Sequence, residues 1–514
     1  MNTNIASFDR LLLAGFVLLA FQLMGPVLTI PLHIPLNYNE GWNAIFDRRA
    51  VTPGTGPLYP PTDSFVFNNY PPLGFYLVGA LGRFVFGDMI VAGRVVALLS
   101  LLSAAALTGV CVRYLGGGLR GALAAGLLLP LYICCYFRKY VAVDDPQWLA
   151  HAIMLGGLAV LLRRGGMNRL RAGDLPLTKL VWAALLMVVA EFIKHNLVAL
   201  PLAATLWLIC LNLRAAAIWL AAALIGLGVG LGATAVLHGH AAFADILHHR
   251  RVFRVGLMKH SIDILAPLLP MAAVAVVLLR LIWRRNVAEN RAGVLFVTLF
   301  GVIALLTGIV QRMGEGVYYN AHFETLIAAT LGFGLALSPV FGAPTKWRGF
   351  AVSPAALGCF AALPLICAWP WHLPRAWADI HDRTARAAAW QPVIARIAAA
   401  AGPVGCLMMS LCWWAGKPSE IDMFNLTQSV VTGGPLAEFQ AVVARQRFAI
   451  FEDDPKSFTH NDAVRQLGYD PIMTLFATGY APVGYGPETT VLLAPIGAKP
   501  RKSLLGDVSA VPHP

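Results

Sequence analysis

Long apolar runs dominate the first 370 residues and are separated by short polar stretches. Each run is close to 20 residues long, which is the length that an α-helix needs to cross a hydrocarbon core about 30 Å thick. We therefore predict eleven membrane-spanning helices. They are residues 11–30, 90–112, 120–137, 147–162, 179–193, 197–212, 215–236, 262–282, 292–311, 323–341 and 350–369.

The composition agrees with a membrane protein. The 514 residues are 58% hydrophobic and only 13% charged, and the mean hydropathy is +0.67, whereas a soluble protein carries roughly 25% charged residues. After Trp369 charged residues, Pro and Gly return. We expect a polytopic α-helical membrane domain at residues 1–370 and a small α/β domain at residues 371–514.

Short-range patterns give further expectations for the C-terminal domain. Strands are predicted at residues 404–414, 448–454 and 489–495, a helix at 436–447, and disorder from about residue 497. The eight cysteines lie mostly in apolar segments, so no disulfide framework is evident. No small-residue cleavage site follows the first apolar run, which we interpret as a retained span and not a signal peptide.

Basic residues predict the orientation. They fill the short loops at residues 113–120, 163–179, 284–291 and 346–348, which share one side if the ambiguous apolar stretch 71–87 does not cross. Positive loops face the cytoplasm. The first outer loop (31–88), including 71–87 as an interfacial or re-entrant helix, and the C-terminal domain then lie outside. Many of the basic residues behind the net charge of +13 lie in these loops, and the rest cluster on the opposite side, so nucleic acid is not an expected partner.

Three carboxylates on the predicted outer side are candidates for chemistry. Glu40 follows the first apolar run, and it either caps a short helix that starts near Gly41 or accepts a proton from a substrate. Asp144 and Asp145 precede Pro146. Asp145 is the expected N-cap of the next helix, which leaves Asp144 as the freer carboxylate.

Cations lie outside as well, where the charge rule expects few. Lys194 and His195 share a helix face with Glu191. Arg250 and Arg251 follow His248 and His249, and they either meet lipid headgroups as a solvated run or clamp a lipid phosphate, for which the arginine fork is suited. The sequence has no H-x-x-x-H, HExxH or CxxC spacing, so the metal signal is weak and a divalent cation is left open as a cofactor.

Several of these motifs together resemble the GT-C glycosyltransferases of the dolichyl-phosphate-mannose protein mannosyltransferase type (glycosyltransferase 39). The resemblance is carried by Glu40, Tyr70–Leu73, Gly87–Asp88 with Arg94, Asp144–Pro146, and the 314–324 loop with Tyr319, Asn320 and His322. It implies inverting transfer from a polyprenyl-phosphate sugar, with the first-loop acid as general base. Where many relatives have Asp, often in an acidic pair, this chain has Glu40 beside Asn39.

The resulting hypothesis is a hexosyl- or pentosyltransferase of the inner (plasma) membrane that moves a sugar from a polyprenyl-phosphate donor to a glycan, lipid or protein hydroxyl outside. The expected catalytic residues are Glu40 and Asp144. The expected donor-phosphate residues are Lys194, His195, Arg250 and Arg251. The expected substrate-binding residues are Trp42, Asn69, Tyr70, Asp145, Tyr319 and His322.

Two other classes compete with this hypothesis. A transporter for a lipid or sugar is disfavoured because no internal repeat is evident and the polar residues lie in outer loops, not at the membrane midplane. A non-catalytic scaffold does not explain why an acid and a basic cluster share one face.

Overall fold

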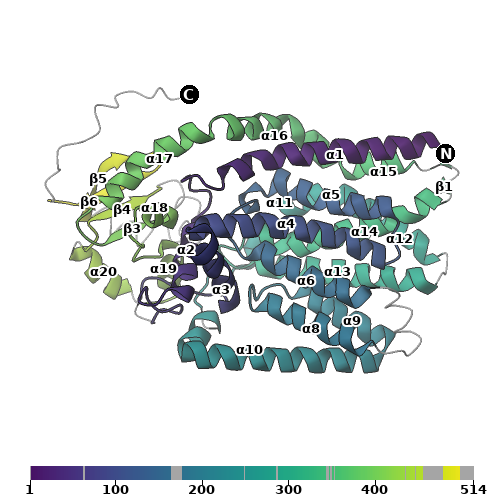
Figure 1. Ribbon diagram of the computed structural model, residues 1–514, viewed down its shortest axis with the longest axis horizontal. Coiled ribbons are helices and arrows are strands. Elements are labelled where there is room, and N and C mark those ends of the chain that lie inside the picture. Colours follow the sequence, from purple (N-terminus) through teal and green to yellow (C-terminus); the bar gives the residue numbers. More distant parts are fainter. Residues whose placement is uncertain are drawn as a thin grey trace.

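The predicted apolar runs form a bundle of roughly parallel helices in the computed structural model, and a small sheet domain lies at one end (Figure 1). The structure describes residues 2–61, 64–163, 176–247, 249–284, 288–342, 346–347, 350–351, 353–434, 436–445, 447–454 and 479–497. The N-terminus lies at the end of the bundle opposite the sheet (Figure 1).

Each predicted span coincides with helix over most of its length, and the span predicted from residue 350 begins with the short strand β2 (Phe350–Ala351), which pairs with β1 (Lys346–Trp347). The long bundle helices are α1 (Asn2–Thr29), α4 (Met89–Tyr114), α5 (Leu119–Tyr136), α6 (Gln147–Leu162), α8 (Leu177–Glu191), α9 (Ala199–Leu211), α10 (Leu213–Leu247), α12 (Leu269–Arg284), α13 (Ala288–Arg312), α14 (Phe323–Gly342) and α16 (Leu363–His381). The short helices α11 (Ser261–Leu265) and α15 (Pro354–Ala361) precede α12 and α16. The helical membrane architecture with a small C-terminal sheet is thus confirmed.

The number of spans stays a prediction. Within the described residues, six helices are long and apolar enough to cross a membrane, or seven if α15 and α16, which meet at 52°, form one broken span.

The helices of the bundle approach each other closely where their side chains are small. A Cβ on Gly121 would lie 2.2 Å from the carbonyl oxygen of Gly334, so α5 and α14 pack backbone to backbone there.

The first outer loop forms two helices at the end of the bundle next to the sheet domain (Figure 1). They are α2 (Tyr38–Val51) and α3 (Pro72–Leu81), which continues as a π-helical turn, Gly82–Phe86. Asn37 caps α2 by accepting a hydrogen bond from the Asn39 amide, so the cap is not Glu40. Helix α10 kinks at Gly239, where φ is 65°, and its last residues pack on this loop through Ala242.

The C-terminal domain contains α17 (Arg383–Ala398), α18 (Met409–Trp414), α19 (Met423–Val431) and α20 (Leu436–Ala444). Its strands are β3 (Val404–Cys406), β4 (Ile450–Asp453), β5 (Tyr480–Tyr485) and β6 (Val491–Pro495). They form a sheet in the order β3-β4-β6-β5, in which β3 and β4 are parallel and the other pairs antiparallel. The domain packs on the segment after α1 through Ile34.

Two expectations for this domain are wrong. The run 404–414 is not one strand, because the chain turns after Cys406 and continues as α18. A disulfide joins Cys406 to Cys412 across this turn, although no disulfide framework was evident from the cysteine positions. Almost all residues from 497 onward, for which disorder was expected, lie outside the described residues. His248 and parts of the basic loops lie outside them too. The predicted domain boundary at residue 370 falls inside helix α16, and the division into two domains stays a prediction.

Candidate functional site at the junction of the bundle and the sheet domain

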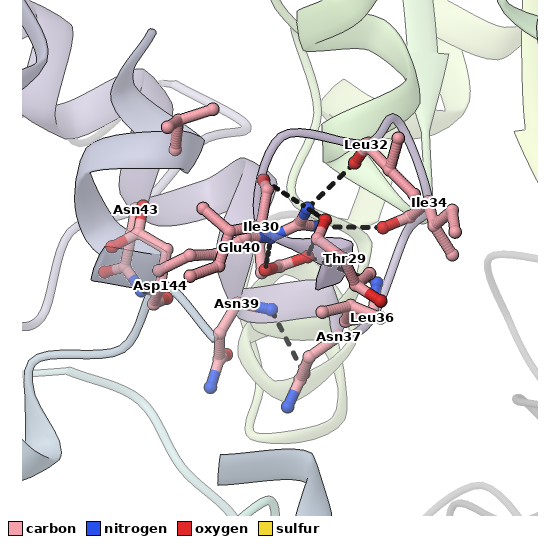
Figure 2. A network of polar contacts seen from close by, with 12 residues as sticks. Thr29, Ile30, Leu32, Ile34, Leu36, Asn37, Asn39, Glu40, Asn43 and Asp144 are labelled. Atoms are coloured by element: carbon pink, nitrogen blue, oxygen red, sulfur yellow. Dashed lines mark hydrogen bonds and ion pairs between the residues drawn. The ribbon is translucent and has the colours of Figure 1, made fainter. Parts of the chain in front are cut away.

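Glu40, which belongs to the polar network drawn in Figure 2, forms a buried ion pair with Arg94. Arg94 Nε donates to Oε1 of Glu40 at 2.7 Å and Nη2 donates to Oε2 at 2.9 Å, and both residues are 0% exposed. The backbone N–H of Leu36 also donates to Oε2, at 3.1 Å. Both oxygens of Glu40 therefore already accept hydrogen bonds.

Arg94 also donates hydrogen bonds to the backbone at the end of helix α1 and just after it. Its two Nη atoms donate to the carbonyl oxygens of Thr29, Ile30, Leu32 and Ile34 at 2.7–3.1 Å. Thr29 is the last residue of α1, where carbonyls have no partner within the helix, and the other three carbonyls belong to the segment that follows, so Arg94 fixes the chain as it leaves the helix. The ion pair thus joins the end of α1, the start of α2 and helix α4. The role of Glu40 as a general base stays a prediction.

Asp145, Lys194 and Tyr70 form a second cluster, on the side of α2 that faces the bundle. Asn39 Nδ2 donates to Oδ2 of Asp145 at 3.0 Å, and Gln147 N donates to Oδ1 at 2.8 Å. Lys194 Nζ lies 3.7 Å from Oδ1 of Asp145 and 3.7 Å from the ring centroid of Tyr70. Burial lowers the pKa of Lys194, but Asp145 and Tyr70 outweigh it and the net pKa is raised. Lys194 is therefore a buried cation.

Arg251 connects this cluster to the sheet domain. It interacts electrostatically with Tyr70, Tyr38 and Asp422, and its Nε has no hydrogen-bond partner among the described residues. The Tyr38 hydroxyl donates to Oδ1 of Asp422, and Trp42 Nε1 donates to Oδ2 at 3.0 Å. Asp422 caps α19. We call Asp145, Lys194, Tyr70, Arg251, Tyr38 and Asp422 the junction cluster.

Asp144 does not belong to the junction cluster, although it is adjacent to Asp145 in the chain. It lies against Asp47 of α2, and both side chains are 2% exposed. Burial, followed by the Asp47 carboxyl, raises the pKa of Asp144 well above its usual range, and burial does the same for Asp47. The freer carboxylate expected from the sequence is thus the more deeply buried of the two neighbours.

Other expected site residues lie in different surroundings. His195 and Arg250 are exposed, and Arg250 donates to the Thr432 carbonyl at 2.9 Å. Asn69 is half-buried in the loop before α3. Tyr319 is 37% exposed and packs on Phe137.

Trp42 and His322 are buried, and each makes a polar contact with a residue of another segment. The Trp42 ring packs against Phe46, Tyr70 and Phe75. His322 is 0% exposed, and its Nε2 lies 3.0 Å from the hydroxyl of Ser261. The structure thus brings together Asp145, Lys194, Tyr70 and Arg251 out of the expected set.

Some residues of the site carried little or no signal in the sequence. Arg94 lies in an apolar run, and a charge in a span usually has a function or a partner. Asp47 meets Asp144, and Tyr38 meets Asp422, only because distant segments fold together. Tyr140 belongs to the same region, since Asp145 and Tyr70 both contribute to raising its pKa after burial. Within the described residues, no group of three or more His, Cys, Asp or Glu side chains could hold a metal ion.

The fold and the site define a helical membrane protein with a sheet domain seated over a polar cluster, and this is the GT-C fold. Crystal structures of ArnT from Cupriavidus metallidurans share it. ArnT bound to undecaprenyl phosphate matches with a TM-score of 0.57 at 15% identity, over 94% of this chain and 98% of ArnT. The apo state matches with a TM-score of 0.57 at 13% identity, over 95% and 98%.

The apo oligosaccharyltransferase of Archaeoglobus fulgidus matches with a TM-score of 0.49 at 12% identity, over 94% of this chain and 74% of that chain. No protein-family model matches the sequence, and no curated protein sequence matches it. The two ArnT matches confirm the expected GT-C architecture at the level of the fold.

Proposed function

We propose that this protein transfers a sugar from a polyprenyl-phosphate-linked donor to an acceptor hydroxyl on the extracytoplasmic face of the membrane, with inversion at the anomeric carbon. The observation that carries the proposal is the junction cluster, in which a buried lysine and an arginine lie beside a carboxylate and tyrosines. This arrangement occurs in a chain with the fold of ArnT, whose structure binds undecaprenyl phosphate.

Lys194 and Arg251 are suited to the donor phosphate. When the acceptor oxygen attacks the anomeric carbon, the bond from that carbon to the phosphate oxygen breaks, and negative charge develops on the leaving polyprenyl phosphate. Cations placed in advance in a water-poor site stabilise such charge strongly. Lys194 is 3% exposed, and Arg251 has a buried Nε that lacks a partner among the described residues.

Asp145 is the carboxylate best placed to take the acceptor proton. It lies within the junction cluster, and Oδ2 has only the Asn39 amide as a hydrogen-bond donor among the described residues. Glu40 would first have to leave Arg94, and Asp144 faces Asp47 instead of the cations. We assign the role of general base to Asp145. The earlier prediction that Glu40 is the base is tested separately, by substituting Glu40.

The orientation is part of the proposal. Disulfides persist in oxidising compartments and are rare in the cytosol. The Cys406–Cys412 disulfide lies in the sheet domain, which supports placing this domain and the junction cluster outside the cell membrane. This agrees with the orientation predicted from the basic loops.

The proposal is tested with the purified full-length protein in lipid nanodiscs. Polyprenyl-phosphate donors that differ in their sugar are supplied with extracted envelope lipids, glycans and proteins as acceptors. Mass spectrometry measures the released polyprenyl phosphate and the glycosylated product. We expect release with at least one donor and its loss in Lys194→Met, which keeps the chain length and removes the charge.

A different result would support a transporter. If the folded protein releases polyprenyl phosphate from none of the donors, but moves a lipid-linked sugar across the membrane of sealed vesicles, the transferase proposal is wrong. Mass spectrometry of the glycoconjugates from a deletion strain then identifies the acceptor when transfer is observed.

A further inference from the structure

Two cavities follow each other along helices α1, α5 and α16. The larger has a volume of about 100 Å³, is lined by apolar side chains, and also touches α14 and α15. The smaller has a volume of about 10 Å³ and is lined in part by Gln22, Arg138 and His372. Helices α1 and α16 lie side by side along the bundle (Figure 1). We call the two cavities together the α1 cleft.

The two parts of the α1 cleft adjoin because the step between them is one helical turn on each helix. The lining passes from the larger to the smaller cavity within three or four residues, at Leu18 and Gln22 of α1, Leu131 and Cys134 of α5, and Trp369 and His372 of α16. The cleft is therefore apolar over most of its length and polar at the end nearer the sheet domain.

Two buried polar atoms in the cleft have no hydrogen-bond partner among the described residues. They are Oε1 of Gln22, whose side chain lines the smaller cavity, and Nε1 of Trp369, whose ring lines the larger one. Gln22 is only 9% exposed. Buried polar atoms nearly always have a partner. The oxygen requires a donor and the indole N–H an acceptor, so a ligand that supplies both is expected at the polar end.

The rim of the smaller cavity carries an excess of positive charge. Arg138 and Arg386 both pair with the carboxylate of Asp379. Arg375 and Arg138 both act electrostatically on His372. Arg375 is exposed, and the side chain of Arg138 is 33% exposed. Three guanidinium groups thus lie around one carboxylate, and this favours an anionic group at the rim.

We propose that the α1 cleft binds one phospholipid molecule with an anionic, hydroxylated headgroup, of the phosphatidylglycerol type, from the leaflet next to the sheet domain. The phosphate contacts the arginines at the rim. A headgroup hydroxyl donates to Gln22, and an ester carbonyl accepts from Trp369. One acyl chain follows the larger cavity into the membrane.

The dimensions of the cleft agree with this ligand. The smaller cavity has room for one hydroxyl-sized group, so the phosphate stays at the rim. An apolar cavity of about 150 Å³ accepts benzene, so the larger cavity takes a segment of an acyl chain. Ala14 and Ile366 line it and are exposed, so the rest of the chain can lie on the bundle surface. From Gln22 to Phe8 helix α1 rises about 21 Å, which is more than half of a hydrocarbon core about 30 Å thick.

The polyprenyl tail of a sugar donor is the competing occupant. None of the residues that line the cleft belongs to the junction cluster. A donor seated in the cleft would place its phosphate at Arg138, away from Lys194 and Arg251. The phospholipid leaves the junction cluster open, and its binding does not depend on the proposed sugar transfer.

The test uses the full-length protein, purified and delipidated in detergent. Native mass spectrometry measures the binding of phosphatidylglycerol, of phosphatidylcholine with the same acyl chains, and of undecaprenyl phosphate. We expect about one tightly bound phosphatidylglycerol per chain. Phosphatidylcholine has no headgroup hydroxyl and would leave Gln22 without a donor, so it should bind at least about tenfold more weakly. Equal binding of the two phospholipids, or displacement of phosphatidylglycerol by undecaprenyl phosphate, would overturn the proposal.

Matched variants locate the lipid. Ala14→Phe places a ring in the larger cavity, and Ala20→Phe places the same ring at another exposed position of α1, outside the cavity lining. We expect the affinity for phosphatidylglycerol to fall about tenfold or more in Ala14→Phe and to change by less than about threefold in Ala20→Phe. Equal affinities in the two variants would mean that the acyl chain lies elsewhere.

Gln22→Leu tests the polar end separately. It removes a buried oxygen that has no partner among the described residues, so the empty protein should fold at least as well as the wild type. We expect the preference for phosphatidylglycerol over phosphatidylcholine to fall to about threefold or less. A folded Gln22→Leu that keeps the full preference would show that the headgroup does not reach the smaller cavity, and would contradict the proposal.

Discussion

Glu40 and Asp47 lie two turns apart on helix α2, and both side chains are buried, yet their surroundings differ. Glu40 accepts hydrogen bonds on both oxygens, and its charge is paired with Arg94. Asp47 Oδ2 has no hydrogen-bond partner among the described residues, and the side chain lies against another carboxyl group, that of Asp144. The same helix thus carries one buried acid with a complete set of partners and one without.

The difference separates structural from functional charge. A buried ion pair with all its hydrogen bonds made is stable only in that arrangement, and removing one partner is costly. A carboxylate with unused capacity can accept a ligand or a proton. Asp145 lies between these cases, because it has two hydrogen bonds and a lysine nearby but faces the cations of the junction cluster. Each prediction below tests one side of this contrast.

The largest effect is expected from Asp145→Asn. Loss of a general base costs roughly 10²–10⁴-fold in rate. The amide oxygen of the variant can still accept from the Gln147 N–H, and a rotated Asn39 amide can accept from the new NH₂ group, so the fold should survive. The measurement is single-turnover sugar transfer by the purified variant, with circular dichroism to verify folding. Asp144→Asn is the matched control from the neighbouring position. Transfer by folded Asp145→Asn at a rate within a few-fold of the wild type would return the base role to Glu40.

The second effect concerns the paired acid. Removing the cation in Arg94→Met leaves Glu40 buried and unpaired, and breaking such a pair costs about 3–5 kcal/mol. Glu40→Gln should cost less, because the amide oxygen still accepts one hydrogen bond from Arg94. Thermal unfolding gives the stabilities, and turnover is measured on the folded fraction.

The two readouts decide the role of Glu40. We expect both variants to lose stability and to retain turnover per folded molecule within a few-fold. A well-folded Glu40→Gln that has lost transfer would show that this acid is catalytic after all.

The sequence predicted the helices well, because each apolar run near 20 residues can bury itself only as a helix in a membrane. It also singled out Asp145, Lys194, Tyr70 and Arg251, which the structure brings together, since charged and aromatic residues in outer loops of such a protein are conspicuous; their roles stay predictions. It did not predict which acid would be paired. Arg94 and Glu40 are 54 positions apart, and only the packing of α4 on α2 brings them together.

Other features depended on contacts between domains. Asp422 meets Tyr38 and Trp42 from 384 and 380 positions away, so no local pattern could indicate it. The strand predicted over 404–414 failed because apolar residues of a short buried helix and of a buried strand look alike. The disulfide within that segment links positions six apart, and cysteine spacing alone does not distinguish such a pair from unpaired cysteines.

A third buried acid extends the contrast to the sheet domain. Burial raises the pKa of Glu452 to about 8 from its ordinary value of 4.5, although the backbone N–H of Met408 donates to it at 2.9 Å. Because the folded state holds the proton more tightly, stability should fall as pH rises from about 4.5 to about 8, by up to about 1.4 kcal/mol per pH unit, and then level off.

Glu452→Gln should flatten this dependence. The variant cannot ionise, so its unfolding temperature should exceed that of the wild type at pH 8 and approach it near pH 4.5. Glu420→Gln, at a partly exposed site paired with Arg447, is the control and should leave the pH dependence in place. An equal pH dependence in wild type and Glu452→Gln would show that Glu452 is ionised in the folded protein.

The smallest effect compares two neighbouring arginines that the sequence could not distinguish. Arg250 is exposed and its described hydrogen bond goes to the Thr432 carbonyl, so it connects the loop to α19. Arg251 points into the junction cluster, where Tyr38, Tyr70 and Asp422 surround it. If the cluster holds the donor phosphate, Arg251→Ala should weaken binding of a polyprenyl phosphate about tenfold or more, since a charged hydrogen bond contributes about 1.5–3 kcal/mol. Arg250→Ala should change it by less than about threefold, as expected for an exposed group. Calorimetric titration of both variants in nanodiscs measures the difference, and equal losses in the two would mean that the phosphate binds at the exposed loop and not in the cluster.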